Sequence, residues 1–159
     1  MKKIYLNNQL KNYYFNCLEE EITLKKIDKG LIDPLRQISN SKNIRPIFSK
    51  KNKDSFGRHN HSYISIAFES NIEEKLLTDI KPYFLSKYNS NKNYECNCIE
   101  IKPYNKKERA TTKKNNGSKW QTDKDYFNVS QIRIDLKKGS KELHDEFWTE
   151  LSAMLSGLM

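Results

Sequence analysis

The chain has 159 residues, of which 36% are hydrophobic and 31% charged, and its formal net charge is +9. This length fits one domain, residues 1–159, with a single sizeable core. No apolar run approaches the roughly 18 residues that cross a bilayer, and three cysteines are too few for a disulfide framework, so we expect a cytoplasmic protein.

Residues 1–40 have the pattern of a helical N-terminal segment. Leu10, Tyr14 and Leu18 recur at helical spacing, which predicts a first helix with one buried stripe. The dipeptide Asp33–Pro34 is typical of an N-cap followed by proline at the first helical position. A short second helix is therefore predicted to begin there.

The next part of the chain, from residue 41, alternates between strand and helix patterns. Apolar residues at every second position predict a strand over 62–68. A helical stripe follows over 71–87, and Pro82 should end or kink that helix near Lys81, because proline removes a donor and clashes with the preceding turn. A weaker strand is predicted over 44–48, limited by Pro46.

The C-terminal part repeats this pattern. Strands are predicted over 94–102 and 127–136, and an amphipathic helix over 140–157. His144 lies beside the apolar stripe of that helix, where a boundary residue is expected.

Together these elements predict an α+β fold with a three- or four-stranded, mainly antiparallel sheet. The order of elements in 41–159 fits a ββα-ββα pattern, with two amphipathic helices on one face of the sheet. Loops over 49–61 and 103–125 would connect the paired strands. If the two units are alike, we expect both loops at one end of the sheet, forming one surface.

Positive charge is concentrated in two short segments. Residues 41–60 and 102–119 hold 13 of the 29 Lys and Arg residues and only two acidic ones, Asp54 and Glu108, for a local net charge of +11. The rest of the chain carries −2. Such a concentration favours binding of a polyanion or an acidic partner over simple solubility, although Lys-rich loops also serve solubility.

The expected binding residues are cations for phosphates and aromatic rings for stacking on unpaired bases. They are Lys50, Lys51, Lys53, Phe56, Arg58, Lys106, Lys107, Arg109, Lys113, Lys114, Lys119 and Trp120.

The leading expectation is a non-enzymatic protein that binds nucleic acid, or an acidic surface of an enzyme that processes nucleic acid. Size, charge and the lack of a catalytic motif would suit a phage or mobile-element accessory protein, including an inhibitor of a nuclease complex such as an anti-CRISPR protein. No membrane partner is expected, because no apolar anchor accompanies the basic residues.

An enzymatic alternative rests on Glu100 and Lys102, which lie two residues apart on a predicted strand and so share a face. The Glu-x-Lys spacing resembles half of the PD-(D/E)xK nuclease motif. The resemblance implies that the carboxylate would hold Mg²⁺ and the lysine would help to position the attacking water. The family also needs an acid on a neighbouring strand, and the candidates are Asp54, Glu69 and Asp79.

Four further residues are candidate zinc ligands, namely His59, His61, Cys96 and Cys98. Their spacing matches no zinc-finger pattern, and small core cysteines with histidines that contact phosphate or water from a loop are the favoured explanation. A histidine nuclease with His59 or His61 as the base is the less favoured alternative. The chain contains no P-loop, GxGxxG or nucleophile elbow, so no cofactor is expected.

Overall fold

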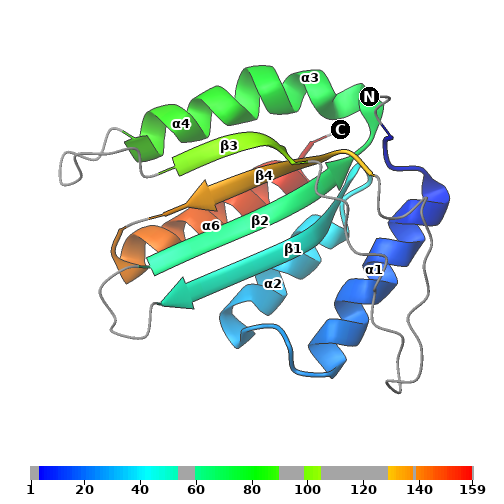
Figure 1. The fold of residues 1–159 in the computed structure, drawn as a ribbon, viewed down its shortest axis with the longest axis horizontal. Helices are drawn as coiled ribbons and strands as arrows, with labels where there is room; N and C mark the ends of the chain where they lie inside the picture. Colours follow the sequence, from blue (N-terminus) through cyan, green and yellow to red (C-terminus); the bar gives the residue numbers. More distant parts are fainter. Residues whose placement is uncertain (1–3, 54–59, 90–98, 105–128, 138, 159) are drawn as a thin grey trace.

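The centre of the molecule is a four-stranded sheet whose neighbouring strands are all antiparallel, in the order β1-β2-β4-β3 (Figure 1). The computed structural model describes residues 4–53, 60–89, 99–104, 129–137 and 139–158. The strands are β1 (Ile44–Lys53), β2 (Asn60–Phe68), β3 (Ile99–Tyr104) and β4 (Gln131–Leu136). The predicted α+β class with an antiparallel sheet is confirmed.

Helices precede, connect and follow the strands. They are α1 (Asn8–Thr23), α2 (Lys29–Ser39), α4 (Lys81–Asn89) and α6 (Lys141–Ser156). Short helical pieces lead from β2 into α4, namely η1 (Ser70–Ile72), α3 (Glu73–Lys75) and η2 (Leu76–Ile80). The predicted helical N-terminal segment is confirmed by α1. Within the described part of the chain, no helix combines the length and the apolarity needed to cross a membrane.

One face of the sheet carries the main core. Ile64 and Ile66 of β2 are fully buried there, and α2 and α6 lie behind the sheet in Figure 1. The rings of Phe84 and Phe147 meet edge to face at 6.0 Å, which joins α4 to α6. Burial of each such side chain contributes about 1.5–3 kcal/mol to stability. The helix residues of this core include Leu31, Leu35 and Ile38 of α2, Phe84 and Tyr88 of α4, and Phe147, Trp148, Leu151 and Leu155 of α6.

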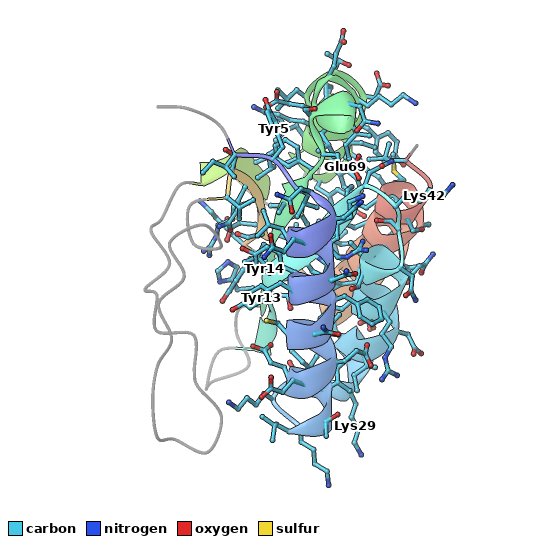
Figure 2. All side chains as sticks on the ribbon, turned by 90° about the vertical axis from the view of Figure 1, so that its right-hand side faces the viewer. Tyr5, Tyr13, Tyr14, Lys29, Lys42 and Glu69 are labelled. Atoms are coloured by element: carbon cyan, nitrogen blue, oxygen red, sulfur yellow. The ribbon has the colours of Figure 1, made fainter. Side chains whose placement is uncertain are left out.

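The N-terminal segment covers part of the other face. Leu10 and Tyr14 of α1 form a second apolar cluster with Ala67 and Val129, and Figure 2 shows α1 from outside. Backbone bonds tie the preceding segment to the sheet, because the Leu6 N–H donates to the Phe68 carbonyl at 3.0 Å. The helix α1 is therefore part of the same folded unit.

The predicted start of the second helix is wrong. The helix α2 begins at Lys29, with Asp28 at the N-cap position, and Pro34 lies inside it. The stripe of Leu31, Leu35 and Ile38 is buried along its whole length, so packing against the core extends the helix one turn ahead of the local Asp–Pro signal.

Pro82 does not end the helix that follows β2. The turn before it is a π-helix, in which the Lys81 N–H donates to the Leu76 carbonyl five residues earlier. A wider turn relieves the clash between a proline ring and the preceding carbonyls. The helix then continues as α4 to Asn89, and Phe84 and Tyr88 remain in the core.

The first strand is longer than predicted. β1 continues to Lys53, and its register with β2 shifts between Pro46 and Phe48, which marks a β-bulge. Proline is tolerated here because β1 is an edge strand and the bulge removes one ladder position. The basic residues at 50–53 thus belong to the sheet rather than to a loop.

The expected position of both strand connections at one end of the sheet is wrong. Lys53 pairs with Asn60 at one end, whereas Tyr104 pairs with Gln131 at the other. The reason is the central pair: β2 and β4 hold equivalent places in the two ββα units and run antiparallel. One unit is thereby turned by about half a turn relative to the other.

Candidate nucleic-acid interface

The sheet face opposite the main core is polar on its two central strands. Alternate residues of β2 and β4 lie on it, and the register places Tyr63 opposite Asp135 and Ser65 opposite Arg133. We call it the His61 face, defined by His61, Tyr63, Ser65, Gln131, Arg133 and Asp135. It has two kinds of region, a charged cluster and a buried amide.

The charged cluster is centred on Asp135, which is only 4% exposed. Arg133 donates to both of its carboxylate oxygens, from Nε at 2.9 Å and from Nη2 at 3.0 Å. His61 Nε2 lies 3.0 Å from Oδ1 of the same carboxylate. The buried charge is thus paired and hydrogen-bonded, as a buried carboxylate requires.

Tyr63 adds an aromatic surface to this cluster. The guanidinium carbon of Arg133 lies 4.1 Å from the centre of its ring, and the His61 ring centre lies 5.7 Å away. The side chain of His61 is 43% exposed. An accessible imidazole, a phenol ring and a guanidinium therefore lie next to one another, a combination suited to stacking on bases and contacting phosphates.

A buried amide lies further along the face. Gln131 and Ser65 are 2% and 0% exposed, and the polar side-chain atoms of both have no hydrogen-bond partner among the residues that the structure describes. An unpaired buried polar group costs about 1–3 kcal/mol. Because both side chains are buried, this end of the face is closed to a ligand.

A cleft of about 250 Å³ opens beside Tyr63, between α1, the turn after it and β1. Burial raises the pKa of Cys17 in its wall to about 11, against a hydrogen bond with Tyr13 that lowers it, so this thiol stays protonated at neutral pH. Burial also raises the pKa of Glu21, while Lys26 lowers it. The cleft thus offers one acidic and one basic group but no thiolate nucleophile.

A second, shallower groove of about 670 Å³ lies where α1 begins, near Glu69 and Lys42 in Figure 2. Lys11 is ion-paired with Glu69, and Arg45 donates to the carbonyls of Lys11 and Ser41. Two of its cations are therefore already engaged with protein oxygens. We do not place a ligand there.

The structure brings only some of the predicted binding residues to the His61 face. Lys50 pairs with Tyr63 and so lies on this face, whereas Lys51 and Lys53 alternate to the other side of the edge strand. The remaining predicted residues lie outside the described residues: Phe56, Arg58, Lys106, Lys107, Arg109, Lys113, Lys114, Lys119 and Trp120. One lysine of β1 thus borders the His61 face, while β3 ends with Tyr104 at the other end of the sheet.

The predicted pair Glu100 and Lys102 lies on β3, directly opposite Asp135 and Arg133 in the register. Asp135 is thus the acid on the strand next to Glu100. Asp135 was not predicted from the sequence, because β4, the strand that carries it, is separated from β3 by a long stretch of chain. The acids named from the sequence lie elsewhere: Glu69 is ion-paired, Asp79 is on η2, and Asp54 lies outside the described residues.

Of the candidate zinc ligands, His61 is bound to Asp135, and His59, Cys96 and Cys98 lie outside the described residues. Within the described ranges, no three metal-binding side chains of His, Cys, Asp or Glu come together. The predicted boundary position of His144 is wrong. It is 1% exposed, and its Nδ1 lies 2.7 Å from Ser62 Oγ under α6.

Comparison with protein-family models, with curated proteins and with solved structures finds no match for this chain.

Proposed function

We propose that this protein binds nucleic acid across the His61 face and the basic half of β1. The observation that carries the proposal is the register of the edge strand, which pairs Lys50 with Tyr63, the residue whose ring also stacks with the Arg133 guanidinium. Cations next to an accessible ring suit a strand with phosphates on one side and unpaired bases on the other.

Charge supports the same proposal. The two basic segments carry all of the excess positive charge, and one of them includes the second half of β1. Release of counterions by these cations would supply most of the affinity and make it depend steeply on salt. Tyr63 and Arg133 would add contacts that salt affects less.

The test is fluorescence-anisotropy binding of labelled single- and double-stranded DNA and RNA over about 50–300 mM salt. We expect affinity that falls linearly on a log–log plot, and a slope that is lower by about one when Lys50 is replaced by alanine. Lys141→Ala is the matched control, because this exposed lysine lies on a helix.

The aromatic contact is tested separately. Tyr63→Leu should weaken binding of single strands roughly ten- to a hundredfold, since stacking on an aromatic contributes about 1–3 kcal/mol per base. Tyr83→Leu, at an exposed tyrosine on α4, should leave it unchanged. Absence of binding to every nucleic acid would contradict the proposal and direct the search to an acidic protein, such as the nuclease complex that an inhibitor would target.

A second candidate is a Mg²⁺-dependent nuclease, favoured by the register that places Glu100 opposite Asp135 with Lys102 two residues on. Glu100→Ala should then abolish Mg²⁺-dependent cleavage and leave binding intact or stronger. The ion pair of Asp135 with Arg133 weighs against it, because a carboxylate held by a guanidinium on both oxygens has less capacity for a metal ion.

A further inference from the structure

We infer that His61 is a general base positioned to cleave RNA without a metal ion, an inference that rests on the proposed binding of nucleic acid to the His61 face. Its basis is the hydrogen bond between an accessible imidazole and a buried carboxylate. This is the base and orienting-acid pair that recurs in enzymes which use histidine to remove a proton.

The carboxylate fixes the tautomer of the imidazole. An ionised carboxylate only accepts hydrogen bonds, so Nε2 of His61 must carry the proton that it shares with Asp135. The lone pair is then on Nδ1, the atom that can accept a proton from a substrate. Arg133 holds both oxygens of Asp135, so the carboxylate is fixed in place and its charge is balanced.

No nucleophilic side chain among the described residues accompanies this base. Ser62 belongs to the other face and is hydrogen-bonded to His144, Ser65 is fully buried, and the thiol of Cys17 stays protonated. This base can then act on water or on a hydroxyl group of the substrate itself, and the inferred reaction uses the second, which the product ends distinguish. Among nucleic acids only RNA has such a hydroxyl group next to its phosphates, the 2′-hydroxyl.

The reaction that follows is an internal transfer at phosphorus. Nδ1 of His61 takes the proton of the 2′-hydroxyl, and the 2′-oxygen forms a bond to the adjacent phosphorus. The bond from phosphorus to the 5′-oxygen breaks, and that oxygen takes a proton from water. The products are a 2′,3′-cyclic phosphate and a 5′-hydroxyl end, and the imidazolium returns its proton to the solvent.

The register supplies positive charge next to this base. Asn52 pairs with His61, and Lys50, two residues earlier on the same strand, shares its face. On the other side, Lys102 pairs with Arg133. Cations on both sides of the pair would hold the phosphate and favour the charge that develops on its oxygens.

The test is incubation of the full chain with a labelled RNA in EDTA, with analysis of the product ends. We expect a cyclic phosphate and a 5′-hydroxyl, and no cleavage of the same strand with 2′-deoxy nucleotides, which should still bind. His61→Ala should lower the rate by roughly 10²-fold or more, the usual contribution of a general base. Added imidazole should restore part of the loss, whereas Lys141→Ala should have no effect.

Asp135 acts through His61 and is a positioning residue. Asp135→Asn should lower kcat while the affinity for the uncleavable 2′-deoxy strand stays unchanged, and circular dichroism checks that the variant folds. Equal loss of rate and of affinity would mean that the carboxylate only supports the fold.

Three results would overturn the inference. Binding of RNA without cleavage in EDTA would leave the proposed function standing and remove the catalytic role. Cleavage that needs Mg²⁺ and is lost in Glu100→Ala would assign the activity to β3 instead. Absence of binding to RNA would remove both the inference and the function on which it rests.

Discussion

His61 and Asp135 of the His61 face come into contact because β2 pairs with β4. Local pattern alone predicts that Ile132, Ile134 and Leu136 are buried and that Arg133 and Asp135 share the other side of their strand. It does not predict that His61 meets Asp135, because this contact joins residues 74 positions apart. Only the pairing of β2 with β4 determines it.

One residue of the turn after α1 has an unfavourable backbone conformation. Lys25 has φ of +59°, in the left-handed region that favours glycine, and the Lys26 N–H donates to the Glu21 carbonyl as in a Schellman motif. Lys25→Gly should therefore raise the free energy of unfolding by about 0.5–1 kcal/mol, measured by urea denaturation.

The adjacent lysine provides the control for this prediction. Among the described non-glycine residues only Lys25 has a positive φ, so the backbone of Lys26 has no need of glycine. Lys26→Gly should therefore be neutral or destabilising. Equal stabilisation by both substitutions would show that lost charge, rather than backbone conformation, is responsible.

At the level of elements, a carboxylate joins α4 to α6. Glu150 of α6 accepts hydrogen bonds from Tyr83 at 2.7 Å, Lys87 at 2.9 Å and Tyr88 at 3.1 Å. Burial alone would raise the pKa of Glu150, but these hydrogen bonds outweigh it and lower the pKa below its usual value. The ionised form is therefore the one that stabilises the helix pair.

Glu150→Gln should lower the free energy of unfolding by about 1–2 kcal/mol at neutral pH. Since the folded pKa is lower than the unfolded one, this contribution is present above about pH 4.5 and declines as the pH falls further. Urea denaturation at several pH values measures the difference between the variant and the wild type.

The control is Glu146→Gln on the same helix. Glu146 is 55% exposed and is ion-paired with Lys87 at 2.8 Å, so its loss should cost about 0.5 kcal/mol or less. An equal effect of both substitutions would contradict the role of Glu150 as the link between the helices.

Elements with a strong apolar period were predictable, and those set by packing were not. The apolar stripe of α6 could be predicted from the sequence because its residues recur at helical spacing. The π-turn before Pro82 has no such signal. It forms because Ile80 and Phe84, on either side of the proline, are both buried in the core.

For the whole molecule, the sequence predicted the class of fold but not the relation of its halves. Two ββα units are compatible with parallel or antiparallel neighbours at the centre, and nothing local distinguishes these arrangements. The observed antiparallel pairing of β2 with β4 puts the end of β1 at Lys53 and the end of β3 at Tyr104 at opposite ends of the sheet.

The same topology predicts that the chain unfolds as one unit. Leu18 of α1 and Leu31 of α2 lie in one core cluster with the sheet and with Trp148 of α6. Because the helices share this core, loss of either end should expose it and unfold the rest. Far-UV circular dichroism, which reports all helices, and tryptophan fluorescence should therefore give coincident urea transitions.

A variant with one tryptophan makes the fluorescence signal specific to the core. In a Trp120→Phe variant the remaining tryptophan is Trp148, which is 2% exposed in the core. Its fluorescence then follows α6 and the sheet, whereas the circular dichroism signal also contains α1 and α2. A helical signal lost at lower urea than the fluorescence would show that the N-terminal helices unfold separately, and that the core formed by the sheet, α4 and α6 is stable without them.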